Sequence, residues 1–172
     1  MATFIQTSGG YLRSTRVTYW TIFAVQTFVA IFAFLVNINK PVDFGKFHPN
    51  DIMAYFIPTI ALGGLIASQV IFKQRLKIVS EKNIFKQKLD CYKSALMTRF
   101  ALLEGPNLMV LAAYFLTDNP LYLAMAVISL VVYLSVFPSV NSISKDLNLS
   151  SEEHAYLANP AHPIGFNPNI EY

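Results

Sequence analysis

The apolar stretch Val17–Val36 (VTYWTIFAVQTFVAIFAFLV) decides the fold class. It contains 20 residues without a charged side chain, which is the length that a helix needs to cross a hydrocarbon core of about 30 Å. Backbone groups have no water partners in lipid, so such a segment has to be a helix and not an open strand. A secretory signal would have a shorter apolar core and a small-residue cleavage site, so we expect a retained membrane helix.

Three further stretches resemble the first, so the sequence predicts four spans. Their bounds are about 17–36, 52–72, 96–116 and 121–138. The composition agrees, because 54% of the residues are hydrophobic and 13% are charged, against about 25% charged residues in an average soluble domain. We therefore expect an all-α integral membrane four-helix bundle, with residues 1–140 as a single membrane domain and residues 141–172 as a cytoplasmic tail.

The distribution of basic residues predicts the orientation. Ten of the 13 lie in the N-terminal segment, the loop after the second span and the tail, which alternating spans place on one side: Arg13, Arg16, Lys73, Arg75, Lys77, Lys82, Lys86, Lys88, Lys93 and Lys145. Only Lys40 and Lys46 lie on the opposite side. By the positive-inside rule, both termini and the middle loop face the cytoplasm. Juxtamembrane lysines and arginines are explained by this topology and by anionic headgroups, so we expect no nucleic-acid partner.

The middle loop and the tail carry helical patterns of their own. Apolar residues recur at helical spacing on both sides of residues 80–83, which predicts a cytoplasmic helical hairpin between spans 2 and 3. Ser150 and Glu153 are spaced as a capping box, which predicts a short C-terminal helix over about 151–157. Beyond it, prolines break any helix, so the tail either stays free or lies along another surface, for which Ile164, Phe166, Ile170 and Tyr172 are the apolar contacts on offer.

Glu104 is the candidate functional residue that stands out. It lies roughly 12 Å inside the cytoplasmic boundary of the third span, where a carboxylate is costly and indicates function by default. Arg99 lies only about 4–5 Å inside and can extend its head to the surface. In one hypothesis Glu104 is a proton or cation relay. In the other it is a protonated structural group, bonded to Gln26, Ser68, Gln69 or a backbone carbonyl freed by Pro106.

Small residues and prolines predict where helices pack. In the second span, Gly63 and Ala67 are four residues apart, as are Gly64 and Ser68, and small residues at this spacing allow helices to approach closely. The partner is either a helix of the same chain or a second copy. Pro58 and Pro106 are also compatible with the broken helices of a transporter.

The sequence offers no catalytic or cofactor motif. It lacks G-x-S-x-G, H-E-x-x-H, C-x-x-C and P-loop patterns, so we expect no enzyme, no cofactor and no metal site. The single cysteine, Cys91, is expected to be an unreactive thiol on the reducing side of the membrane. The outer-loop residues Asp43, His48 and Asp51 are interpreted as solvated loop residues rather than cation ligands.

The second half of the chain resembles a family of small, uncharacterised four-span bacterial membrane proteins. The resemblance rests on the following segments: Lys88-Leu89-x-x-Tyr92-x-x-Ala95, Arg99-x-Ala101-Leu102-Leu103-Glu104-Gly105-Pro106, Phe115-Leu116-Thr117-x-Asn119, and Pro138-Ser139 with Leu147-x-Leu149-Ser150-x-x-Glu153. It implies a location in the bacterial inner membrane and implies no mechanism.

These patterns favour a non-catalytic accessory or structural component of a membrane complex. Its expected partners are the lipid bilayer and either another membrane protein or further copies of itself. The alternative is a small oligomeric transporter or proton- or cation-linked channel that uses Glu104. A membrane enzyme would require Arg99, Glu104 and Gln26 to converge around a cavity.

Overall fold

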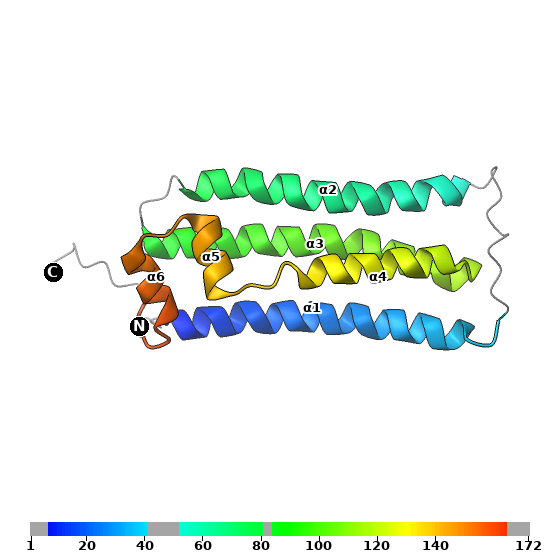
Figure 1. Cartoon of the computed structure of the whole chain (residues 1–172), viewed down its shortest axis with the longest axis horizontal. Coiled ribbons are helices and arrows are strands. Elements are labelled where there is room, and N and C mark those ends of the chain that lie inside the picture. The colour runs from blue at the N-terminus through cyan, green and yellow to red at the C-terminus, as the bar shows by residue number, and fades with distance from the viewer. Residues whose placement is uncertain (1–6, 41–51, 81–83, 165–172) are drawn as a thin grey trace, which may run out of the picture. The chain divides into compact units, whose positions relative to one another are not determined.

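The computed structural model describes residues 7–40, 52–80 and 84–164, and it is built from α-helices (Figure 1). The helices are α1 (Ser8–Asn37), α2 (Ile52–Ser80), α3 (Phe85–Thr117), α4 (Pro120–Leu134), α5 (Val140–Leu147) and α6 (Ser151–Ala158). Within these residues the only β-type pairing is an isolated bridge between Thr7 and Pro163. The all-α prediction is therefore confirmed.

Among the described residues, three helices are long and apolar enough to cross a membrane, namely α1, α2 and α3. Each is longer than the predicted span that it contains, because the helix continues past the end of the uncharged run. The fourth predicted span is different, since α4 has only 15 residues and a length of about 22 Å. The structure thus supports a protein with several membrane helices.

The fourth span was predicted to reach Pro138, but its helix ends at Leu134. Pro138 has no N–H to donate to a helix, and its ring disfavours helical dihedral angles at Phe137. The start of α4 at Pro120 lies close to the predicted start of the fourth span at residue 121. The Oδ1 of Asn119 accepts a hydrogen bond from the Leu121 N–H at 3.0 Å, and Pro120 occupies the first turn, where its missing N–H costs nothing.

The chain groups into two compact units. The bundle unit comprises residues 20–71 and 98–136. In it, segments of α1–α4 run side by side with alternating direction (Figure 1). All four contribute to one apolar core, which contains Ala30 and Ala33 of α1, Ile57 and Ala61 of α2, Val110, Leu111, Ala113 and Tyr114 of α3, and Tyr122 and Ala126 of α4. The small alanines let the helices approach closely, and the tyrosine rings fill the space between them.

The terminal unit comprises residues 1–19, 72–97 and 137–172, and it contains the predicted hairpin. The end of α2 and the start of α3 pack against each other: the rings of Phe72 and Tyr92 lie 6.0 Å apart in an edge-to-face arrangement, and Val79 and Leu89 are buried. The apolar positions that recur at helical spacing on these two helices are therefore in contact with each other. Residues 81–83, which were expected to form the turn of the hairpin, lie outside the described residues.

The tail contains two short helices, where the sequence predicted one. The predicted helix is α6, and its capping box is confirmed by reciprocal hydrogen bonds between Ser150 and Glu153. The unpredicted helix is α5, which begins with a second reciprocal box between Ser139 and Ser142. It ends at Asn148, which has a left-handed backbone with φ of 47°. Two serines are a weaker capping pattern than serine with glutamate, so the sequence around Ser139 does not predict this helix.

Candidate functional site

Glu104 lies on the outward face of α3 in the bundle unit. Its side chain is half-buried, and its neighbours on that face, Ala101, Gly105, Leu108 and Ala112, are exposed. A Cβ added at Gly105 would meet nothing within 4 Å. These positions follow the three- and four-residue spacing of one helix face. The carboxyl is therefore presented away from the core of the bundle unit.

The residues proposed as partners of Glu104 are bonded elsewhere. The Ser68 hydroxyl donates to the Leu65 carbonyl at 2.7 Å, and the Arg99 Nη2 donates to the Gln69 Oε1 at 2.9 Å. Within the described part of the chain, no side chain forms a hydrogen bond or ion pair with Glu104. Ser68, Gln69 and Arg99 thus form hydrogen bonds with residues other than Glu104.

Gln26 pairs with Asn107, a residue that sequence inspection did not single out. The Asn107 Nδ2 donates to the Gln26 Oε1 at 3.4 Å, and both side chains are about 1% exposed. The Gln26 Nε2 and the Asn107 Oδ1 have no hydrogen-bond partner in the structure. Asn107 lies three residues after Glu104, about 60° around the helix, and it is buried whereas Glu104 is half-buried. A polar side chain in an otherwise apolar span was the available signal.

At Gly64, α2 and α3 pack closely against each other. A Cβ at this position would lie 2.3 Å from the Pro106 Cγ and 2.9 Å from the Leu102 carbonyl oxygen. That carbonyl is the one whose helical donor is replaced by Pro106, and it is directed toward Gly64 rather than toward Glu104. Ser68, one turn after Gly64, is also fully buried.

The remaining predicted packing residues lie on other surfaces. A Cβ at Gly63 would meet nothing within 4 Å, and Ala67 is half-buried. Pro58 and Pro106 each lie inside a helix that is assigned without interruption. Gly63 and Ala67 therefore do not take part in the close contact between α2 and α3 at Gly64.

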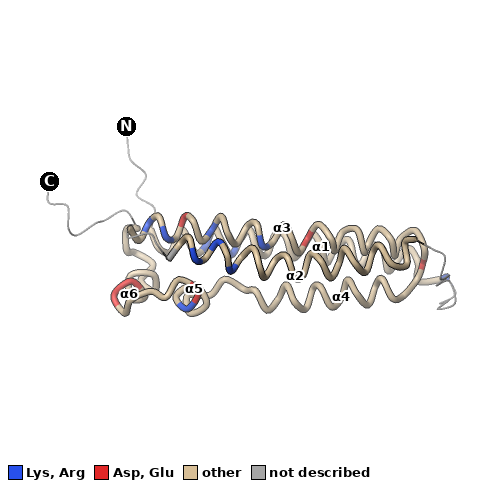
Figure 2. The backbone as a smooth tube through the Cα atoms, turned by 90° about the horizontal axis from the view of Figure 1, so that it is seen from above, with Lys and Arg blue, Asp and Glu red and all other residues tan. Residues whose placement is uncertain are grey.

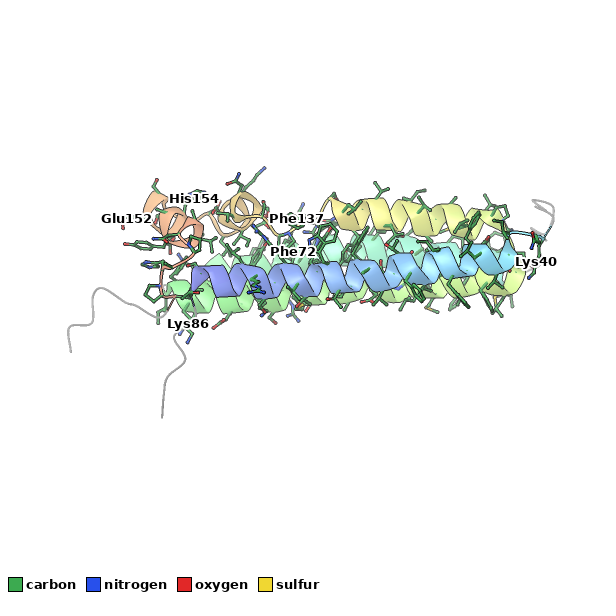
Figure 3. All side chains as sticks on the ribbon, turned by 90° about the horizontal axis from the view of Figure 1, so that it is seen from below. Lys40, Phe72, Lys86, Phe137, Glu152 and His154 are labelled. Atoms are coloured by element: carbon green, nitrogen blue, oxygen red, sulfur yellow. The ribbon has the colours of Figure 1, made fainter. Side chains whose placement is uncertain are left out.

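Polar contacts also stabilise the bundle unit where α1 ends and where α3 turns into α4. Lys40, labelled in Figure 3, forms an ion pair with Asp118 at 2.8 Å. The Asn37 Nδ2 donates to the Tyr114 carbonyl at 3.4 Å. Asp118 has a φ of 59°, and this left-handed conformation is tolerated by aspartate better than by bulky residues. These contacts join the end of α1 to the turn between α3 and α4.

The terminal unit holds most of the basic residues of the helices, as Figure 2 shows at the start of α1, the end of α2 and the start of α3. The tail of this unit is bonded both to the start of α1 and to the start of α3. The Ser8 N–H donates to the His162 carbonyl at 2.9 Å, and the Gly9 N–H donates to the Pro160 carbonyl at 3.0 Å. Lys88 of α3 forms an ion pair with Glu153 of α6 at 2.7 Å. Of the two alternatives for the tail, the structure shows the docked one as far as Ile164, which is buried.

The described residues hold no group of three His, Cys, Asp or Glu side chains placed to bind a metal ion. Asp43, His48 and Asp51 lie outside the described residues, as do Phe166, Ile170 and Tyr172. Comparison with known protein families, curated proteins and solved structures finds no match to this chain. The resemblance noted for residues 88–153 therefore remains an expectation.

Proposed function

We propose that the protein crosses the bacterial inner membrane four times, with both termini in the cytoplasm. The contacts of the tail support an even number of crossings. Ser8 and Lys88 bond to His162 and Glu153, so the N-terminus, the hairpin and the tail lie on one side of any membrane. If α3 leaves that side, α4 has to return to it.

The shortness of α4 is compatible with this crossing. Its 15 residues carry no charge, and residues 135–137 add an uncharged segment before Pro138. A short apolar helix is accommodated by local thinning of the bilayer, at a modest cost per ångström of mismatch. The basic hairpin then lies in the cytoplasm, as the positive-inside rule requires.

Within this topology, the protein acts as a non-catalytic accessory component of a membrane complex. The observation that carries this proposal is the outward position of Glu104 on α3. Ionisable side chains within membrane spans almost always face a protein interior or a water-filled cavity. The adjacent Ala101 and Gly105 would allow another helix to approach closely. A helix of another membrane protein, or of a second copy, is therefore the surface expected to cover this face.

A comparison of matched glycine variants tests the accessory role. Gly105→Leu would block the outward face of α3, whereas Gly63→Leu adds the same side chain at an equally open position on α2. We expect Gly105→Leu and Glu104→Leu to remove a partner or second copy from the protein purified in mild detergent, as measured by native mass spectrometry. Gly63→Leu should retain it. A wild-type protein that is always an isolated monomer would contradict the proposal.

The second candidate is a transporter that uses Glu104, favoured by the location of this carboxyl near the middle of a long apolar helix. The two functions make opposite predictions for Glu104→Gln, which keeps the shape and loses the titratable group. A transporter should lose ion flux in proteoliposomes, whereas an accessory component should still assemble. Wild-type flux that disappears in Glu104→Gln would establish the transporter in place of the accessory protein.

A further inference from the structure

A groove of about 310 Å³ lies between α2 and α3 in the terminal unit. Arg75, Ile78 and Val79 of α2 line one side, and Cys91 and Ser94 of α3 line the other. Arg75 Nη1 donates to the Ser94 Oγ over a long 3.4 Å distance. A guanidinium carries five N–H donors in a planar fork, so this one contact leaves most of them available. None of the described residues that line the groove is acidic.

The polar end of this groove lies at the depth of lipid headgroups if the predicted spans are correct. Arg75 follows Phe72, the last residue of the second predicted span, by roughly 4–5 Å along the helix. Ser94 precedes Leu96, the first residue of the third span, by about 3 Å. The headgroup layer is about 5–7 Å thick on each side of the hydrocarbon core. Both side chains therefore lie within that layer.

We propose that this groove binds the phosphate group of an anionic phospholipid from the cytoplasmic leaflet, an inference that rests on the proposed membrane topology. The Arg75 fork matches the paired oxygens of a phosphate. Ile78 is 59% exposed and lies about 9 Å past Phe72 along the helix, so it lines the side of the groove that faces away from the acyl chains. The volume is at the lower end of the range for small-molecule sites, which suits a headgroup and not a whole lipid.

The surrounding charge favours the same ligand. Lys73 and Lys77 lie on the same stretch of α2, Lys86 lies near the start of α3, and all three are exposed. Basic residues next to a membrane attract anionic lipids, and basic pockets between membrane helices on the cytoplasmic side hold their headgroups. The acyl chains hold a lipid phosphate at the depth of Arg75 and Ser94, and a soluble anion lacks this anchor, so a lipid is the ligand expected in the groove.

Cys91 provides a probe of occupancy, because it is the only cysteine in the chain and it lines the groove. The full-length protein is reconstituted into phosphatidylcholine vesicles with or without phosphatidylglycerol, and the rate of Cys91 labelling by uncharged N-ethylmaleimide is measured. We expect anionic lipid to slow labelling about fivefold. This factor corresponds to about 1 kcal/mol, the binding free energy that one basic residue gains near an anionic surface. Arg75→Gln should abolish most of this protection.

Lys73→Gln is the matched control. It removes the same charge two residues away but leaves the lining of the groove unchanged, so protection should remain. Equal loss of protection in both variants, or none in the wild type, would overturn the lipid site. So would equal protection by inorganic phosphate in phosphatidylcholine vesicles, which would assign the groove to a soluble anion. Insertion is scored separately by resistance to carbonate extraction, and its failure would contradict the membrane topology instead.

Discussion

The Nζ of Lys88 and the Oε1 of Glu153 lie 2.7 Å apart, and this ion pair joins α3 to a helix 65 positions later in the chain. The other carboxylate oxygen of Glu153 accepts the Ser150 N–H at 3.0 Å. One side chain therefore both caps α6 and attaches it to the hairpin. The folding of the tail helix and its position on α3 are coupled through this carboxylate.

This double role predicts that docking of the tail weakens in acid. Burial alone would raise the pKa of Glu153, but the hydrogen bond and charge of Lys88 and the bonds with Ser150 outweigh it, and the pKa lies below its usual value. A depressed carboxyl pKa stabilises the folded form above the unfolded pKa, near 4.3, and this contribution is lost as the pH falls through the folded value. The protection of residues 151–158 against hydrogen exchange, relative to the unfolded chain at the same pH, should therefore fall below about pH 4.

Glu153→Gln should remove this dependence and release α6 at neutral pH, at a cost of about 1 kcal/mol because the pair is partly exposed. Glu152→Gln is the control, since Glu152 is exposed at the neighbouring position of the same helix (Figure 3). Its exchange profile should match the wild type. Identical exchange in the two variants would show that the Lys88 contact does not hold the tail.

The pairing of the N-terminus with the tail makes a second prediction, at Gly9. A Cβ there would lie 2.9 Å from the Pro160 carbonyl oxygen, whereas a Cβ at Gly10 would meet only the Thr7 Oγ1 at 3.4 Å. Overpacking of about 1 kcal/mol should make Gly9→Ala open its tail about fivefold more often. Limited proteolysis of the tail should be faster by this factor, and Gly10→Ala should behave as the wild type.

A third prediction concerns the two adjacent glycines of α2. Gly64→Ala would place a methyl group within 2.3 Å of the Pro106 Cγ and should destabilise the protein by about 1–3 kcal/mol. Gly63→Ala has open space and gains helix propensity, so it should be neutral or more stable by up to about 1 kcal/mol. Thermal unfolding in detergent measures both. If Gly64→Ala unfolds at the wild-type temperature, α2 and α3 do not pack closely at this point.

The features that could be predicted from the sequence are those that depend on residues close together along the chain. An uncharged run such as Val17–Val36 defines a helix by itself, and the Ser150–Glu153 box forms within one turn. The hairpin belongs to the same class, since its apolar spacing is visible on each side of the turn. Local spacing was sufficient to place α1, α2, α3 and α6.

The features that the sequence did not predict depend on contacts between distant segments. Nothing near Asn107 indicates that its partner is Gln26, 81 positions earlier. Spacing alone also could not decide which of Gly63 and Gly64 faces α3, because adjacent residues differ by only 100° around the helix. Likewise, the length of the fourth apolar run concealed the end of α4 at Leu134 and the start of α5.

The buried amide pair makes the last prediction. Replacing Gln26 or Asn107 alone with leucine leaves one amide buried without its partner, which should cost about 1 kcal/mol. Replacing both removes the unmet polar groups together, so the double variant should be destabilised by less than the sum of the single variants. The coupling in this cycle should be about 0.5–1 kcal/mol, as for hydrogen bonds between membrane helices, and unfolding in mixed micelles measures it. If the losses in the free energy of unfolding of the two single variants add up to the loss in the double variant, the two amides do not interact in the membrane.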